Sequence, residues 1–95
     1  MAAYLIAEVD VQDAAQFEEY RKIVPGTIAK HGGRYVVRGG ATETLEGGWT
    51  PKRIVVLEFP SMDQARQWYH SSDYAPALAM RLKAAKTRAI LVDGA

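Results

Sequence analysis

The sequence of 95 residues contains no cysteine and no asparagine. Without cysteine the chain can form neither a disulfide framework nor a thiolate metal site, and without asparagine it has no acceptor for N-glycosylation. No apolar run approaches the roughly 20 residues of a membrane span, and the first residues lack the basic and apolar regions of a signal peptide. We therefore expect a cytoplasmic protein with no membrane partner.

The chain carries no large excess of either charge, since 12 Lys and Arg residues face 11 Asp and Glu residues and leave a net charge of +1. Proteins that bind nucleic acids usually carry a basic patch, because neutralising phosphates supplies most of their affinity. The densest basic segment comprises Arg81, Lys83, Lys86 and Arg88. It falls where we expect a helix to end, so the helix dipole explains it. We predict no nucleic-acid partner.

Hydrophobic periodicity divides the chain into strand, helix, strand, strand, two helices and strand. Strands are predicted over residues 4–9, 34–38, 53–59 and 87–93, with helices starting after Asp13 and Ser61 and a third running from Tyr74 to about Ala85. Two split βαβ units of this length form a ferredoxin-like α+β domain, a four-stranded antiparallel sheet with helices on one face. We predict one such domain over residues 1–95.

Local signals refine the expected helices and loops. Pro25 lies inside the first helical pattern and removes one backbone hydrogen bond, so we expect a kink or a broken turn there. Gly32 is placed to end that helix in the left-handed conformation. Tyr20 and Trp68 lie on the apolar stripes of their helices and are interpreted as core residues. Residues 41–46 are expected to extend the second strand as an arm.

Alternation along the strands assigns the side chains to two faces of the sheet. The helix-covered face is predicted to be apolar apart from one phenol: Leu5, Ala7, Val9, Tyr35, Val37, Val55, Leu57 and Phe59. The opposite face takes Tyr4, Ile6, Glu8, Arg34, Val36, Arg38, Ile54, Val56 and Glu58. Its apolar members would form a patch that is large for a monomer. We therefore predict a homodimer in which two sheets face each other about a two-fold axis, with a weakly amphipathic free sheet as the alternative.

Several strings in the chain occur in the order typical of a known family. They are Ala3-Tyr4-Leu5-Ile6-Ala7-Glu8-Val9, His31-Gly32-Gly33-Arg34-Tyr35, Arg38-Gly39-Gly40, Leu45-Glu46-Gly47, Glu58-Phe59-Pro60-Ser61, Ala65-Arg66-Gln67-Trp68-Tyr69, Ser72-Asp73-Tyr74 and the single Arg81. Together they resemble the bacterial family catalogued as domain of unknown function 1330, within the dimeric α+β barrel superfamily. The resemblance implies the same dimeric barrel but no reaction. Relatives in the superfamily include cofactor-independent monooxygenases, lactone isomerases and haem-dependent enzymes, and a shared fold does not transfer their chemistry.

Three charged residues, Glu8, Arg38 and Glu58, are expected among apolar neighbours on the partner-facing side of the sheet. A buried carboxylate without a partner is unfavourable, so the glutamates are expected to pair with Arg38. As catalytic residues, the three would line a pocket between helix, sheet and partner, where desolvation could raise the pKa of one carboxylate and make it a general base. As structural residues, they would form an ion pair that fixes the dimer register.

The ligand-binding candidates are Trp49, Arg53, Tyr69 and His31. The first three could form the mouth of the same pocket, an amphipathic wall around a small aromatic or carboxylic ligand, although Trp49 is equally well placed to anchor the dimer. His31 is an acid/base candidate because histidine titrates near neutral pH. It lies at a helix C-terminus, however, where a histidine simply interacts with free carbonyls, and His70 lies in the same kind of place. Two such histidines do not indicate a metal site, and nothing favours haem or another cofactor.

Two functions from different classes follow. In the first, the protein binds a small acidic or aromatic metabolite beside the dimer interface, either as a binding protein or as a cofactor-independent enzyme for proton transfer or oxygenation. In the second, it is a non-catalytic dimeric module, a ligand sensor or accessory subunit whose charges are structural. A cavity beside the charges favours the first function. Charges closed into ion pairs with no space beside them favour the second.

Overall fold

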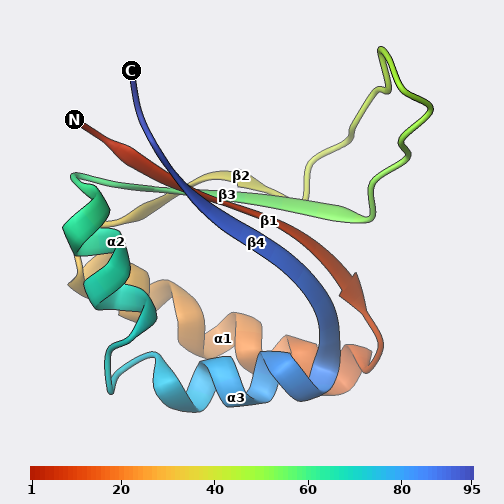
Figure 1. Ribbon diagram of the computed structural model, residues 1–95. Helices are drawn as coiled ribbons and strands as arrows, with labels where there is room; N and C mark the ends of the chain where they lie inside the picture. The colour runs from red at the N-terminus through yellow and green to blue at the C-terminus, as the bar shows by residue number, and fades with distance from the viewer.

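A computed structural model describes residues 1–95 as one antiparallel sheet with three helices. The elements follow in the order β1 (Ala3–Val11), α1 (Ala14–Lys30), β2 (Arg34–Arg38), β3 (Arg53–Phe59), α2 (Met62–Tyr69), α3 (Ala75–Ala84) and β4 (Ala85–Asp93). The strands are arranged as β2-β3-β1-β4, and the helices lie on the same side of the sheet (Figure 1). The predicted ferredoxin-like α+β fold is confirmed, and β4 starts slightly earlier than expected. None of the helices has the length and apolar character needed to cross a membrane.

Asp13 caps the N-terminus of helix α1, and its carboxylate accepts a hydrogen bond from the Gln16 backbone N–H at 3.1 Å. The helix then continues through Pro25, so the broken turn expected there is not formed. Pro25 removes one backbone hydrogen bond, but Val24 and Ile28 on either side are buried in the core and hold the helix in place. Gly32 has a φ of +79°, and it ends the helix in the left-handed conformation as predicted.

The core lies between the sheet and the helices, with Trp68 among its most buried side chains. The Trp68 ring centroid lies 5.4 Å from that of Phe59 and 4.1 Å from that of Tyr74. Its indole N–H donates to the Thr27 hydroxyl at 3.0 Å, and that hydroxyl donates to the Val24 carbonyl at 2.8 Å. Because the indole N–H is paired, burying the Trp68 ring stabilises the fold without leaving an unpaired polar atom. Truncating the ring should therefore lower the free energy of unfolding by about 3–5 kcal/mol. The interpretation of Trp68 as a core residue is confirmed.

A bulge in β2 changes the face on which Arg38 lies. The register of β2 against β3 shifts between Tyr35 and the end of the strand, and Arg38 comes to lie opposite Val55. One extra residue in a strand reverses the alternation beyond it, and residues directly opposite each other share a face. Arg38 therefore lies on the helix-covered face. The prediction that it shares the open face with Glu8 and Glu58 is wrong.

Residues 39–52, here called the arm, connect β2 and β3 as an irregular loop that projects beyond the sheet (Figure 1). The expected extension of β2 over residues 41–46 does not form a strand. The returning part of the arm is tied to β1 at Glu8, which accepts hydrogen bonds from the Trp49 indole N–H at 3.3 Å and the Lys52 backbone N–H at 3.2 Å. Trp49 is nevertheless 55% exposed, so the arm presents an aromatic side chain to solvent.

Candidate functional site

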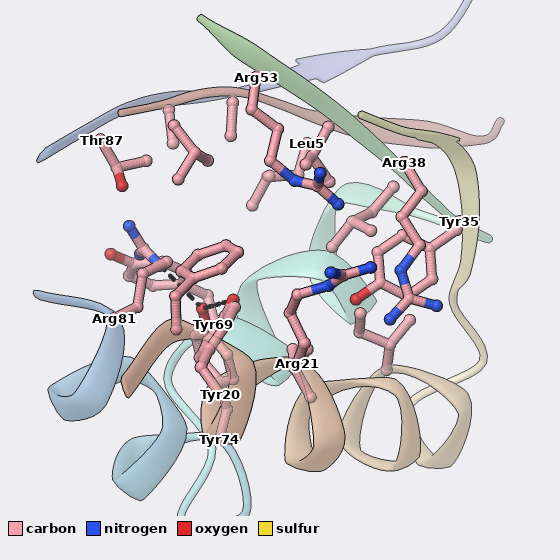
Figure 2. Close-up of a pocket in the computed structure, with 18 of the residues that line it drawn as sticks. Leu5, Tyr20, Arg21, Tyr35, Arg38, Arg53, Tyr69, Tyr74, Arg81 and Thr87 are labelled. Carbon is pink, nitrogen blue, oxygen red and sulfur yellow. Dashed lines mark hydrogen bonds between the residues drawn. The ribbon is translucent and has the colours of Figure 1, made fainter. Parts of the chain in front are cut away.

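The predicted site residues lie in three separate places. Glu8 and Glu58 belong to the open face of the sheet, and Trp49 lies beside that face. A cavity on the helix-covered side is lined by Arg38, Arg53 and Tyr69 (Figure 2). His31 lies outside both groups. The residues therefore do not form one cluster, and the two sides of the sheet have to be considered separately.

Glu8 is the centre of a hydrogen-bonded group on the open face. Its Oε1 accepts from Arg88 Nη2 at 2.6 Å and from Arg88 Nε at 3.1 Å, while Oε2 accepts the two bonds from the arm. The Arg88 hydrogen bonds, followed by that of the Lys52 N–H, hold the pKa of the Glu8 carboxyl below its ordinary value. The carboxylate therefore stays ionised and joins β4 to the arm through β1.

Glu58 is paired in a similar way at the other end of the open face. It accepts from Arg34 Nε at 2.7 Å and from the Tyr4 hydroxyl at 3.0 Å. These bonds, with Arg34 the larger cause, lower the pKa of the Glu58 carboxyl. Neither glutamate pairs with Arg38, so that expected pairing is wrong. The expected rise in a carboxylate pKa is wrong too, because both glutamates have gained hydrogen-bond donors that stabilise the ionised form.

His31 forms the C-cap of α1. Its Nε2 lies 3.4 Å from Asp73 Oδ2, while Asp73 Oδ1 accepts a hydrogen bond from Lys30 Nζ at 3.0 Å. His70 likewise caps α2. Both histidines therefore lie at helix C-termini as expected, but the side chain of His31 lies beside a carboxylate and not beside free carbonyls. The structure brings together no group of three His, Cys, Asp or Glu side chains that could hold a metal ion.

The cavity on the helix-covered side has a volume of about 50 Å³ and 19 lining residues. We call it the arginine pocket, because all the charged residues that line it are arginines, Arg21, Arg38, Arg53 and Arg81, with Thr87 as a further polar residue. The remaining 14 residues are hydrophobic and include four phenols, Tyr20, Tyr35, Tyr69 and Tyr74. No carboxylate and no histidine lines it. A pocket with this lining attracts anions and offers no carboxylate or imidazole as a base.

Three arginines converge on one side of the pocket (Figure 2). The Arg38 guanidinium lies 4.3 Å from the centre of the Tyr35 ring, a cation–π distance. The Nε atoms of Arg21 and Arg53 are buried and have no hydrogen-bond partner. Burial, and then the charges of Arg21 and Arg38, lower the pKa of Arg53. The only carboxylate that pairs with any of the three is Glu18, at 2.9 Å from Arg21 Nη1 on the exposed side of α1.

Gly39, the first residue of the arm, lets Arg53 lie in this position. Gly39 has a φ of +70°, and its N–H donates to the Ile54 carbonyl at 2.8 Å. A Cβ on this residue would overlap the Arg53 guanidinium. The arm thus begins beside Arg38 and ends beside Arg53, so two of the pocket arginines flank it directly in the sequence.

The other side of the pocket holds a chain of hydrogen bonds. The Arg81 Nε donates to the Tyr74 hydroxyl at 3.3 Å, and the Tyr74 and Tyr20 hydroxyls lie 3.0 Å apart (Figure 2). Burial is the main cause that raises the pKa of Tyr20, so this phenol remains protonated. The Thr87 hydroxyl is buried on the same side without a hydrogen-bond partner. Tyr20 is therefore a polar lining residue as well as a packing residue.

The sequence interpretation identified Arg38, Arg53 and Tyr69 but missed the two arginines on helices. Arg21 follows Phe17 by four residues and Arg81 follows Ala77 by four, so each lies on the buried stripe of its helix. A charged residue at a stripe position is the signal that could have found both. The convergence of strand and helix arginines depends on the tertiary fold and on the β2 bulge.

A family model described as domain of unknown function (DUF1330) matches residues 2–95. The chain therefore belongs to this family, as its sequence resemblance indicated. The search of curated proteins found no match.

Several solved structures share the fold. A protein of unknown function from Rhodopseudomonas palustris has a TM-score of 0.78 at 18% identity, covering 99% of this chain and 82% of that one. SnoaB, a cofactor-independent oxygenase from Streptomyces nogalater, has a TM-score of 0.68 at 15% identity, with 99% and 93% covered. A dimeric ferredoxin-like protein of unknown function from Thermobifida fusca has a TM-score of 0.60 at 19% identity, with 99% and 92% covered. At these identities the likeness is one of fold.

Proposed function

We propose that this member of the DUF1330 family binds a small acidic aromatic metabolite in the arginine pocket. The observation that carries the proposal is the convergence of Arg21, Arg38 and Arg53 on a cavity that no carboxylate lines. Arg21 pairs with Glu18 on the exposed side of α1, but Arg38 and Arg53 have no carboxylate partner, so their charges repel one another and need a counter-charge. An anionic ligand supplies that charge, and the guanidinium N–H groups match a carboxylate in geometry.

The size and the apolar lining of the pocket limit the ligand further. A volume of about 50 Å³ exceeds the ~10–15 Å³ needed for one water, but it is well below the roughly 300–1,000 Å³ of sites for drug-sized ligands. The phenol rings and aliphatic side chains favour a flat apolar body. On the scale of ~10–15 Å³ for one water the pocket has room for about three to five waters, which limits the ligand to about the size of one aromatic ring bearing a carboxylate.

Calorimetric titration with benzoate and with neutral benzamide tests the proposal. We expect benzoate to bind and benzamide to bind at least about tenfold more weakly, because charge-assisted hydrogen bonds are worth more than neutral ones. Arg53→Met should lower the affinity for benzoate by a similar factor. The matched control is Arg66→Met, since Arg66 lies on the exposed surface of α2 and pairs only with Asp63. Equal affinity for the two probes would contradict the proposal.

Oxygenation without a cofactor is a second candidate function. The fold neighbour SnoaB is described as a cofactor-independent oxygenase. In this chain the arginines would stabilise a substrate phenolate that has lost its proton to solvent, and the phenolate would supply the electrons that reduce O₂. We expect oxygen uptake with a dihydroxybenzoate if the pocket is catalytic, and loss of that uptake in Arg53→Met. Binding without oxygen uptake would favour the non-catalytic sensor or accessory module.

We also propose a homodimer that buries the open faces of two sheets. The proposal is supported by a cross-strand row in which Ile6 lies between Val56 and Ile90, and by the exposure of Ile90, which is 61% in the single chain. Fold neighbours described as dimeric add to this support. Since Glu8 and Glu58 already pair within the chain, they can face an apolar partner surface without leaving an unpaired charge.

A further inference from the structure

The arginine pocket has two chemically different ends. Figure 2 shows Arg21, Arg38 and Arg53 on one side of the cavity and Thr87 with Arg81 on the other. The first end has guanidinium groups with buried N–H donors that lack partners. The second end has the hydroxyl groups of Thr87, Tyr20 and Tyr74 and a single cation, Arg81, whose Nε donates to Tyr74. A ligand that spans the cavity therefore meets three guanidinium groups at one end, called the arginine end, and hydroxyl groups bonded to a single arginine at the other, called the hydroxyl end.

The direction of the hydrogen bonds at the hydroxyl end follows from Arg81. A guanidinium can only donate, so the Tyr74 oxygen accepts from Arg81. Tyr74 is almost fully buried, and apart from Arg81 the only polar group bonded to its oxygen is the Tyr20 hydroxyl. The Tyr74 proton is therefore donated to the Tyr20 oxygen. This leaves the Tyr20 proton free to be donated into the cavity that its side chain lines.

The positive charge of Arg81, at the start of this series of hydrogen bonds, strengthens the Tyr20 hydroxyl as a donor at its end. Each hydrogen bond polarises the next one, and the effect is larger in a site that excludes water. Arg81 is only 7% exposed, so its charge is little screened. The Tyr20 hydroxyl is therefore a stronger donor than an isolated phenol, and it is suited to an oxygen that carries partial negative charge.

From this geometry we infer that Tyr20 selects the ligand by donating a hydrogen bond to a second oxygen, at the end of the molecule opposite its carboxylate. The ligand class is a single-ring aromatic acid with a hydroxyl or carbonyl oxygen across the ring. The buried Thr87 hydroxyl can complete the pairing of that oxygen. The inference rests on the proposed function, because it takes the carboxylate end as given and adds the specificity of the other end.

Calorimetric titration with 4-hydroxybenzoate and with benzoate tests the inference. We expect 4-hydroxybenzoate to bind about tenfold more tightly, because it fills both ends of the pocket. Tyr20→Phe should reduce this ratio to about one while still binding benzoate, since the arginine end is intact. The matched control is Tyr35→Phe, which removes a phenol hydroxyl from the arginine side. It should change the affinity for both probes by the same factor and leave their ratio unchanged.

The outcomes separate the two proposals. If both acids bind with equal affinity, or if Tyr20→Phe keeps the wild-type ratio, Tyr20 does not select the ligand and this inference fails while the proposed function stands. If neither acid binds, both fail. Should Tyr20→Phe lose its fold, Tyr74→Phe provides a second variant. It disconnects Arg81 from Tyr20 and should lower the ratio without removing the Tyr20 hydroxyl, and an unchanged ratio there also counts against the inference.

Discussion

The two faces of the sheet both carry charged side chains among apolar neighbours, but they pair those charges differently. On the open face, Glu8 is bonded to Arg88 at 2.6 Å and Glu58 to Arg34 at 2.7 Å. On the helix-covered face, Arg38 and Arg53 have no carboxylate partner within the chain. The glutamates of the open face are therefore paired without a ligand, whereas Arg38 and Arg53 in the pocket have no partner of opposite charge.

This difference distinguishes charged residues that stabilise the structure from charged residues that are available to bind a ligand. A paired glutamate on an apolar surface keeps strand neighbours in register and can be covered without a large desolvation cost. Neighbouring arginines without counter-charges destabilise the free protein and are tolerated where they serve binding. The open face is thus suited to a second copy of the chain, and the pocket is suited to a small anion.

The largest expected effect comes from placing an unpaired charge on the open face. Ile6→Arg puts a cation at the centre of the apolar row, where burying it in a dimer should cost about 3–5 kcal/mol. The free protomer should tolerate the change, because Ile6 is 37% exposed there. We expect sedimentation to show a dimer for the wild type and a monomer for the variant. Ala15→Arg, on the exposed side of α1, is the control and should remain dimeric. A wild-type monomer at micromolar concentration would contradict the proposed interface.

The second prediction links the arm to the pocket through Gly39. In Gly39→Ala the positive φ should cost about 1–2 kcal/mol in the free energy of unfolding. The new Cβ also overlaps the Arg53 guanidinium, and because that side chain is flexible the overlap is relieved by moving it. We therefore expect weaker benzoate binding in addition to lower stability. Gly40→Ala is the control, since its Cβ would meet no atom within 4 Å. Unchanged affinity in Gly39→Ala would show that Arg53 does not bind the anion.

The fold could be predicted from the sequence because its signals are local. Strand alternation, the Asp13 cap and the positive φ of Gly32 each depend on a few neighbouring residues. The pairing of Glu8 with Arg88 depends instead on the register of β1 against β4, which brings together residues 80 positions apart. That pairing becomes visible only when the strand order is used as well as the alternation.

The site was harder to predict than the fold, because one extra residue in β2, the bulge, determines the face of the sheet on which Arg38 lies. The sequence Arg34–Arg38 gives no signal for the bulge. Its two valines are adjacent, so a regular strand and a bulged strand both present a valine to an apolar neighbour. The bulge moves Arg38 from the open face to the pocket and thereby removes the expected partner of the glutamates. Arg21 carried a usable signal, a charge on a buried helix stripe. Its approach to Arg53 depends on how α1 packs on the sheet.

The third prediction concerns the stability of the unliganded pocket. Arg53→Met removes a buried N–H without a partner and the repulsion with Arg21 and Arg38 while keeping an apolar stem. We expect the free energy of unfolding to rise by about 1 kcal/mol although benzoate binding falls. Arg88→Met, on the open face, should have the opposite effect and destabilise the protein, because it leaves Glu8 with fewer partners. Denaturant titrations of both variants measure the difference, and a loss of stability in Arg53→Met would show that the arginine is structural.

The smallest expected effect is the pH dependence due to Glu58. Hydrogen bonds from Arg34 and Tyr4 hold the pKa of this carboxyl below its ordinary value of 4.5. Its stabilising contribution is therefore present above pH 4.5 and is lost as the pH falls through the lower pKa of the folded state. Glu58→Gln should unfold at a lower temperature than the wild type near neutral pH, and the difference should shrink in acid. Tyr4→Phe removes one donor and keeps the carboxylate, so it should show the same trend at smaller amplitude. A difference that does not change with pH would mean that the open-face charges contribute through packing alone.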